Sequence, residues 1–382
     1  LMARVVVFTD PGAPGIRPPL EIFAELARRG EQLIIYAGAT YRDAVEAAGA
    51  TYRGYHGIGR EGPARQADGM ARRMDIAERV LPEVLEALRA DLPDYVVLDA
   101  AATWGRIAGE VLRLPTISYR RGPPVGRDLC DAKMAPEHRE SAGRLDRQYG
   151  SRTADLAACM ECRCDLNLVL LSRVWLADAA ELDGSYRFVG SCAADPTDAG
   201  ESPWSELETD PLIYVSLETA LDGGEALLRA CVEAFGGLPF AVVVRLGQGQ
   251  ERRAAGPAPR NFRLVASAPQ AQLLERATLA ITSGDARTVE ECARAGVLQL
   301  LYPQDGEQRL MAARVEELGV GLRLQDSDLE GGRLRAVAGR VMADPRYCRA
   351  AEALRDVVRA GGAAQACDQI LAFAGRTGTR GR

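Results

Sequence analysis

Short apolar segments alternate with amphipathic segments along most of the chain. Residues 5–8 form the first apolar segment, and residues 18–29 follow with the spacing of a helix that has one apolar face. The same alternation continues through the first half and predicts further strands at residues 33–37, 95–98, 116–119, 166–171 and 186–189. Short apolar strands separated by helices are typical of a parallel sheet that helices cover on both faces.

Two segments interrupt this alternation. Apolar residues at helical spacing predict a helix over residues 74–90, with its apolar stripe toward the core. We expect a kink at Pro82, because proline removes a backbone donor and crowds the preceding turn. Residues 121–158 are polar and contain a Gly-Pro-Pro turn, so we expect irregular structure and short helices there.

A second series of strands and helices follows a polar segment. Residues 193–210 carry proline, glycine, serine and acids, which indicates a linker. Strands are then expected at residues 212–217, 240–246, 262–265, 279–282, 298–302 and 321–324. Two helices, at residues 346–359 and 363–373, precede a tail at 375–382 that we expect to be disordered. The predicted organisation is a domain at residues 1–192, a linker at 193–210, a domain at 211–360 and a C-terminal helix and tail at 361–382.

Composition argues against several classes of protein. A chain of 382 residues suits two domains of about 150–200 residues each. The formal net charge is -6 and no long basic run is present, so we expect no nucleic-acid partner. No apolar run approaches the ~18 residues that a membrane span needs. No signal peptide precedes the strand at residues 5–8, and we therefore expect a cytoplasmic protein.

Cysteine and histidine offer little sign of a metal site. Nine cysteines are present, and an odd, scattered set argues against a disulfide framework. Cys159, Cys162 and Cys164 have a spacing that soft metals use, but on a helix Cys164 would point away from the other two. We therefore expect core or subunit packing and no metal. The chain has two histidines, His56 and His138. The simpler interpretation of each is a solvent-exposed side chain.

The most specific motifs lie in the second half. Residues 281–291 and 302–308 each join a predicted strand to the start of a helix, where phosphate groups commonly bind. Both segments resemble the diphosphate and sugar motifs of the macrolide-type (antibiotic) glycosyltransferases. Other segments that resemble the family are residues 99–105, 165–170, 212–219, 261–277 and 312–319.

The chain is therefore identified as a member of that family, which implies the GT-B fold. This is an α/β fold in which two doubly wound, Rossmann-like domains face each other across a cleft. The resemblance implies that residues 1–192 bind the acceptor or substrate and that residues 211–360 form the nucleotide-sugar-type domain.

The resemblance also shows which catalytic group is missing. Family members use a histidine in the first turn as the general base, since a hydroxyl is too weak an acid to react unaided, and an aspartate orients that histidine. Gly15 stands at the histidine position and Arg17 at an asparagine position, whereas Asp99 matches the orienting aspartate. The remaining candidates for catalytic roles are Asp99, Asp10 and Arg17.

Several donor-site positions also differ from the family pattern. Ser267 stands where a tryptophan would stack on the nucleobase, and Ser283 where a histidine would donate to the diphosphate. Asp285 and Glu218 stand at glycine positions, and we expect Asp285 to cap its helix with its own carboxylate. Glu291, Glu307 and Gln308 keep the character of sugar- or ribose-binding groups. The full set of candidate ligand-binding residues is Gly15, Glu218, Ser267, Gln270, Ser283, Gly284, Asp285, Arg287, Glu291, Glu307 and Gln308.

These substitutions lead to two functional hypotheses. The first is a glycosyltransferase-like protein of bacterial natural-product biosynthesis that binds a bulky, largely apolar small molecule in the interdomain cleft. It would not perform the usual transfer from a nucleoside diphosphate sugar, and would act as a nonstandard enzyme or as an accessory protein. The alternative is a functional hexosyl or deoxysugar transferase with an unusual donor and an aspartate or substrate-assisted base. Arg17 and Arg287 would clamp a substrate carboxylate or simply be exposed.

The expected partners follow from the same hypotheses. A small-molecule natural product is the expected ligand, and we expect no cofactor. A homodimer and a complex with an active homologue both remain open.

Overall fold

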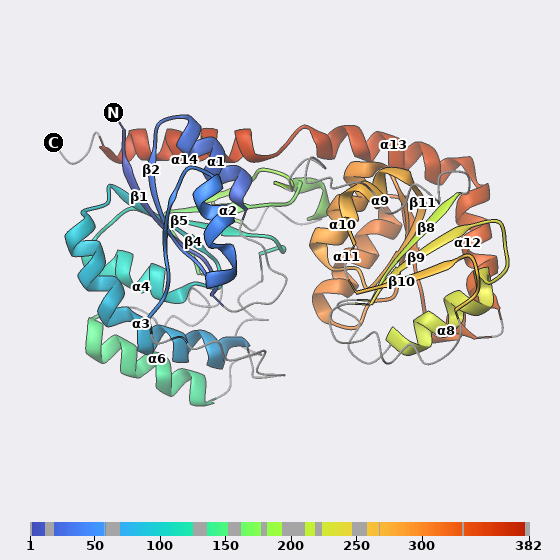
Figure 1. Cartoon of the computed structure of the whole chain (residues 1–382), viewed down its shortest axis with the longest axis horizontal. Coiled ribbons are helices and arrows are strands. Elements are labelled where there is room, and N and C mark those ends of the chain that lie inside the picture. Colours follow the sequence, from blue (N-terminus) through green and yellow to red (C-terminus); the bar gives the residue numbers. More distant parts are fainter. Residues whose placement is uncertain are drawn as a thin grey trace. The chain divides into compact units, whose positions relative to one another are not determined.

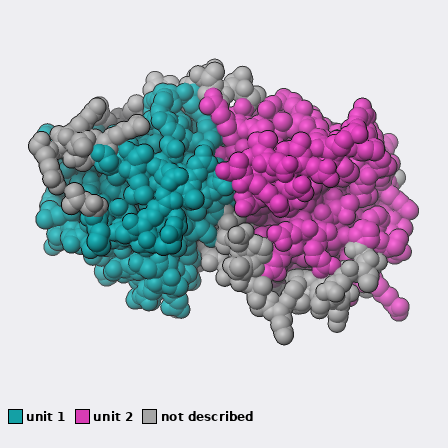
Figure 2. Space-filling view, turned by 90° about the horizontal axis from the view of Figure 1, so that it is seen from above, with its two compact units in different colours: residues 1–170, 179–192, 361–382 teal, residues 171–178, 193–360 magenta. Residues whose placement is uncertain are grey.

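Two parallel sheets form the framework of the protein, for which a computed structural model gives the coordinates. The structure describes residues 2–11, 19–56, 58, 69–124, 136–151, 162–176, 182–192, 211–217, 224–246, 258–266, 268–330 and 332–378. Contacts divide the chain into two compact units, which Figure 2 colours separately. Unit 1 is Leu1–Leu170, Ala179–Cys192 and Gly361–Arg382, and unit 2 is Leu171–Asp178 and Ala193–Ala360.

The sheet of unit 1 has the strand order β3-β2-β1-β4-β5-β6-β7, and all its pairs are parallel. Its strands are β1 Arg4–Phe8, β2 Gln32–Tyr36, β3 Thr51–Arg53, β4 Tyr95–Asp99, β5 Thr116–Arg120, β6 Leu166–Val169 and β7 Tyr186–Phe188. The helices are α1 Leu20–Arg28, α2 Arg42–Ala47, α3 Gly69–Asp91, α4 Thr103–Leu112, α6 Pro136–Tyr149 and α14 Ala363–Gly378 (Figure 1). Short 3-10 turns occur at Ala39–Tyr41 and, in the segment that groups with unit 2, at Arg173–Trp175.

Helices cover both faces of this sheet, as the alternation predicts. Side chains of a strand point to opposite faces in turn, so Val5 and Val7 lie in one core cluster while Val6 and Phe8 lie in the other. The first cluster includes buried residues of α1, α2 and α14, and the second includes those of α3, α4 and α6. The doubly wound α/β architecture is therefore confirmed for this unit.

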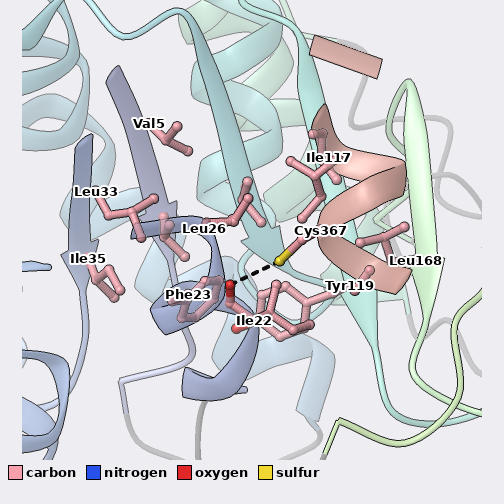
Figure 3. Close-up of a cluster of buried hydrophobic side chains, with 14 of the residues drawn as sticks. Val5, Ile22, Phe23, Leu26, Leu33, Ile35, Ile117, Tyr119, Leu168 and Cys367 are labelled. Carbon is pink, nitrogen blue, oxygen red and sulfur yellow. Dashed lines mark hydrogen bonds between the residues drawn. The ribbon is translucent and has the colours of Figure 1, made fainter. Parts of the chain in front are cut away.

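Helix α14 brings the end of the chain back onto unit 1. Ala366, Cys367 and Ile370 of α14 are fully buried against α1 and the strands. Figure 3 shows the Cys367 thiol within this cluster, where it donates to the carbonyl oxygen of Ile22 at 3.3 Å. The predicted start of a disordered tail at residue 375 is wrong, since α14 continues to Gly378. One glycine costs a helix only about 1 kcal/mol, and Gly375 does not end this one.

The sheet of unit 2 has the strand order β10-β9-β8-β11-β12-β13, and its pairs are also parallel. Its strands are β8 Leu212–Ser216, β9 Ala241–Arg245, β10 Phe262–Val265, β11 Ala277–Thr282, β12 Leu298–Leu301 and β13 Gly321–Arg323. The helices are α8 Gly224–Phe235, α9 Gln270–Arg276, α10 Ala286–Ala295, α11 Gly306–Glu317, α12 Arg333–Ala343 and α13 Pro345–Arg359, with a 3-10 turn at Asp326–Leu329 (Figure 1).

Three segments test the more local predictions. The helix predicted at residues 74–90 is α3, which begins earlier, contains Pro82 and buries the expected apolar stripe. The polar region 121–158 contains α6 among its described residues. Cys162 and Cys164 are buried in the unit 1 core, whereas Cys159 lies outside the described residues. In the part of the chain that the structure describes, no helix has the length and apolar composition to cross a bilayer.

Each sheet has one point at which the strand order changes direction. In unit 1 this point lies between β1 and β4, and in unit 2 between β8 and β11. Connections run to opposite faces at such a point, which leaves a crevice outside the carboxyl ends of the two strands. Ligands of open α/β sheets commonly bind there, so these two places are where the candidate residues are expected to gather.

Candidate functional site

Asp10 follows β1 at the switch point of unit 1 and is held by an arginine. Arg72 of α3 donates from both terminal nitrogens to the two carboxylate oxygens of Asp10, at 3.0 and 3.1 Å. The Asp10 side chain is 11% exposed and that of Arg72 31% exposed. A bidentate arginine–carboxylate pair fixes geometry as well as charge. Arg72 lies 62 residues from Asp10 in the sequence, and no motif singled it out.

Asp99 ends β4, directly across the switch point from β1. Its Oδ1 accepts a hydrogen bond from the backbone N–H of Ala101 at 2.8 Å, and Nη1 of Arg121 lies 3.7 Å from its Oδ2. Burial raises the pKa of Asp99; the positive charge of Arg121 and the Ala101 N–H oppose that shift, and the negative charge of Asp10 adds to it. The structure therefore brings Asp10 and Asp99 near each other at this edge of the sheet.

Aromatic side chains lie beside these carboxylates. The Tyr55 hydroxyl donates to the carbonyl oxygen of Thr9 at 2.7 Å and accepts from the indole nitrogen of Trp104 at 3.3 Å. Its ring lies 5.4 Å from that of Tyr36 and 5.7 Å, edge to face, from that of Trp104. Burial raises the pKa of Tyr55 well above its usual range. The aromatic group is thus neutral and fixed in place.

Sequence reasoning considered His56 in this region and missed Tyr55. His56 is 84% exposed, and its Nδ1 lies 2.5 Å from Oε1 of Glu83. A surface contact of this kind agrees with the solvated interpretation. No apolar segment precedes Tyr55, which lies just after β3, and its partners are distant in sequence: Thr9 after β1, Tyr36 of β2 and Trp104 of α4.

The switch point of unit 2 leads into α10, where the predicted helix cap is confirmed. Gly284 has φ +90°, a conformation that favours glycine, and it places Asp285 at the start of the helix. Oδ1 of Asp285 accepts a hydrogen bond from the backbone N–H of Thr288 at 3.0 Å. Ser283 is buried just before this turn. The Asp285 carboxylate thus satisfies one of the backbone N–H groups that a helix start leaves without an intrahelical partner.

Glu291, one turn further along α10, has both carboxylate oxygens engaged by side chains. Nε of Arg287 donates to Oε1 at 2.8 Å, and Nε2 of Gln270 donates to Oε2 at 2.5 Å. Gln270 also accepts from the hydroxyl of Tyr214 at 2.8 Å. One network of hydrogen bonds therefore connects Arg287, Glu291, Gln270 and Tyr214. Thr288 belongs to it as well, since its hydroxyl lies 3.3 Å from Gln270 Nε2.

The second predicted helix start, that of α11, has a similar arrangement. Asp305 caps α11 by accepting from the backbone N–H of Gln308 at 2.9 Å, and Oε1 of Gln308 accepts from the backbone N–H of Gln304 at 2.7 Å. Gln308 is buried and Glu307 is exposed. A Cβ at Gly284 would lie 3.4 Å from the Gln308 carbonyl oxygen, so the two helix starts are close together.

Glu290 was not predicted to have a role, yet it is fully buried. It accepts hydrogen bonds from the indole nitrogen of Trp175 and from the backbone N–H of Ser172, the latter at 3.0 Å. Nε of Arg314 in α11 donates to the Val174 carbonyl oxygen at 2.7 Å. These bonds explain why Leu171–Asp178, which follows β6 of unit 1 in sequence, groups with unit 2.

Four candidate residues lie outside the part of the chain that the structure describes. They are Gly15, Arg17, Glu218 and Ser267. Their roles, like those of the other candidate residues, stay predictions from the sequence.

Comparisons with known proteins agree with the resemblance. Residues 229–371 match the family described as erythromycin biosynthesis protein CIII-like, C-terminal domain. The chain is 26% identical to the NDP-glycosyltransferase YjiC of Bacillus licheniformis, with 99% of each chain covered. It is 27% identical to the demethyllactenocin mycarosyltransferase of Streptomyces fradiae, with 97% of this chain and 86% of the relative covered. The crystal structure of the glycotransferase of kitacinnamycin has a TM-score of 0.84 at 24% identity, covering 97% of this chain and 98% of that one.

Proposed function

Because the chain is similar to the macrolide-type glycosyltransferases of GT-B fold, we propose that it belongs to that family and binds a bulky, largely apolar natural product but does not perform the usual transfer from a nucleoside diphosphate sugar. It would serve natural-product biosynthesis as a nonstandard catalyst or as an accessory protein. Asp99 and Asp10 would act as acid, base or anchor in the first unit, with Arg17 as a further candidate.

The cap on α10 is the observation that carries this proposal. Asp285 satisfies the Thr288 N–H with its own carboxylate at 3.0 Å, at the helix end where the family resemblance would seat a diphosphate. A carboxylate about 5 Å from a phosphate charge repels it by about 3 kcal/mol at an effective dielectric constant of about 20. Arg287 offsets little of this repulsion, since its charge is already shared with Glu291.

Titration of the natural protein with UDP and dTDP, and with their sugars, tests the proposal. A ligand at 100 times its dissociation constant stabilises a protein by about 2.7 kcal/mol, which a melting curve detects readily. We expect no shift in melting temperature up to millimolar nucleotide. Micromolar binding of either nucleotide would contradict the proposal.

A second candidate function is a working hexosyl or deoxysugar transferase with an unusual donor. Burial raises the pKa of Asp99, and a carboxylate with a raised pKa is a stronger base than an ordinary one. Asp99 would then take the proton of the acceptor hydroxyl itself. Formation of a glycosylated macrolide or aromatic aglycone by the natural protein, lost in D99N, would favour this function over the first.

The accessory role makes a prediction about assembly. A homodimer or a complex with an active homologue would both increase the mass in solution. Sedimentation of the protein alone, and mixed with an active homologue, distinguishes these assemblies from a monomer.

A further inference from the structure

The hydroxyl of Tyr119, on β5, is buried and has no hydrogen-bond partner among the residues that the structure describes. Tyr119 as a whole is 1% exposed. A buried hydroxyl without a partner is unfavourable, and a phenylalanine would fill the same space without that penalty. A tyrosine at this position therefore calls for an acceptor that its hydroxyl can reach.

Strand pairing places Asp99 beside Tyr119. The parallel strands β4 and β5 pair the two residues, and the backbone N–H of Ala100 donates to the Tyr119 carbonyl oxygen at 2.9 Å. Paired residues of neighbouring strands lie about 4.8 Å apart and point their side chains to the same face. The Tyr119 ring packs edge to face against that of Phe23 at 6.0 Å, in the cluster that Figure 3 shows. The ring is therefore fixed on the face that also carries the Asp99 carboxylate.

Asp99 also has an oxygen that lacks a close donor. Its Oδ1 accepts from a backbone N–H at 2.8 Å, whereas Nη1 of Arg121 lies 3.7 Å from Oδ2, which is longer than an ordinary hydrogen bond. The nearby Asp10 is a poorer acceptor, because Arg72 already donates to both of its oxygens. A guanidinium has only donors and cannot accept from a hydroxyl. Oδ2 of Asp99 is therefore the acceptor that suits the Tyr119 hydroxyl.

We infer that Tyr119 is a positioning residue for Asp99, whose ionised carboxylate accepts a hydrogen bond from the Tyr119 hydroxyl at Oδ2. This role rests on the proposed function, in which Asp99 is a candidate acid, base or anchor, and adds the residue that orients it. The backbone holds one carboxylate oxygen and the hydroxyl holds the other. The carboxylate then presents its remaining lone pairs to a ligand in a fixed direction.

The charges around the two residues agree with a hydrogen bond in this direction. Burial, followed by the negative charge of Asp99, raises the pKa of Tyr119 well above its usual range, so the phenol keeps its proton and donates it. Burial raises the pKa of Asp99 as well, and Arg121 is the strongest influence against that shift. A hydrogen bond from Tyr119 to the ionised carboxylate acts in the same direction as Arg121. The described charged and titratable groups that face the pair are Asp10, Arg73, Arg121 and Tyr55.

Replacement of Tyr119 by phenylalanine tests this role through the pKa of Asp99. The sample is the protein without ligand, labelled with carbon-13 at its aspartate carboxyl groups, and the Asp99 signal is the one missing from D99N. Loss of a hydrogen bond to the ionised carboxylate should raise the measured pKa of Asp99 by about one unit in Y119F. Y95F is the matched control, because Tyr95 is an equally buried tyrosine at the other end of β4. Its hydroxyl donates to Glu31 at 3.3 Å, so Y95F should leave the pKa of Asp99 unchanged.

The pH dependence of stability gives a second measurement. Y119F lacks the hydrogen bond to ionised Asp99, so its melting temperature should fall further below that of the natural protein as pH rises from about 4 to about 8. In the D99N background residue 99 cannot ionise. There the Y119F substitution should change the melting temperature by the same amount at every pH.

An equal or lower pKa of Asp99 in Y119F would overturn the positioning role, because a hydroxyl that serves packing alone leaves that pKa unchanged. An equal rise in Y95F would contradict it, and so would a pH-dependent effect of Y119F that persists in the D99N background. All these measurements are made without ligand. Binding of UDP by the natural protein would therefore contradict the proposed function and leave the positioning role standing.

Discussion

The buried carboxylate of Glu290 accepts a hydrogen bond from the indole nitrogen of Trp175 and so fixes Leu171–Asp178 to helix α10. The adjacent residue, Glu291, has a different set of partners, Arg287 and Gln270. Two neighbouring acids on one helix are therefore both satisfied inside unit 2, one holding a connecting segment and one holding the helix start.

Removal of the Glu290 carboxylate should destabilise unit 2. Glu290→Ala leaves the Trp175 indole and the Ser172 N–H without their acceptor, and we expect the free energy of unfolding to fall by about 2–3 kcal/mol. Urea unfolding followed by tryptophan fluorescence measures the loss. Glu225→Ala on α8 is the control: its side chain is 71% exposed, and a change within about 0.5 kcal/mol is expected. Equal effects of the two substitutions would show that the Glu290 bonds contribute little.

Removal of the Asp285 cap should lower the free energy of unfolding by less than removal of the Glu290 carboxylate does. The size of the loss should depend on which residue replaces Asp285. Asp285→Ala removes the acceptor of the Thr288 N–H, and we expect a loss of about 1 kcal/mol. Asp285→Asn keeps a side-chain oxygen, so its free energy of unfolding should fall by only about a few tenths of a kcal/mol. Thermal unfolding of both variants, compared with Asp305→Ala at the equivalent cap of α11, checks this order. A D285A variant as stable as the natural protein would mean that the cap is not formed.

Ionisation of Asp99 should make stability depend on pH. Burial raises the pKa of Asp99 in the folded state, so folded protein holds this proton more tightly than unfolded protein does. Protonated Asp99 therefore stabilises the folded protein at pH values below the pKa that Asp99 has in the unfolded chain. This stabilisation is lost as the pH rises through the pKa that Asp99 has in the folded protein. Asp99→Asn cannot ionise, so the free energy of unfolding of the natural protein should fall relative to D99N as pH rises from about 4 to 7. Parallel pH profiles for the two proteins would contradict the shift.

Helix α14 should contribute to the stability of unit 1. Ile370 is fully buried against α1 and the sheet, and Ile370→Ala should lower the free energy of unfolding by about 2–5 kcal/mol. Val357→Ala on α13 removes a side chain that is 57% exposed and should change stability by less than about 0.5 kcal/mol. Chemical denaturation compares the two. A small effect at Ile370 would indicate that α14 is not needed to complete the core.

The periodic features of the sequence were enough to predict both sheets, apart from strand β3. Apolar segments at regular intervals predict β1 and β8 because burial on both faces of a sheet requires them. The Asp285 cap was also predictable, since an aspartate at a helix start has few alternatives. Strand β3 was missed because its residues are exposed or half-buried and carry no apolar pattern.

Contacts between distant residues were not predictable from one sequence. The Asp10–Arg72 pair joins the loop that follows β1 to α3, and the Glu290–Trp175 pair joins residues separated by 115 positions. The Arg287–Glu291 pair has the four-residue spacing at which helix ion pairs form, but the family resemblance suggested a ligand for each residue separately. Local chemistry was thus easier to predict than the choice of partner.

A crystal of the natural protein soaked with millimolar dTDP or a dTDP-sugar tests most directly whether Asp285 has taken the diphosphate's place. We predict that no diphosphate lies against residues 283–288 and that the Asp285 carboxylate still accepts from the Thr288 N–H. A diphosphate seated on those residues, with Asp285 turned away from Thr288, would contradict the proposed loss of nucleotide-sugar binding.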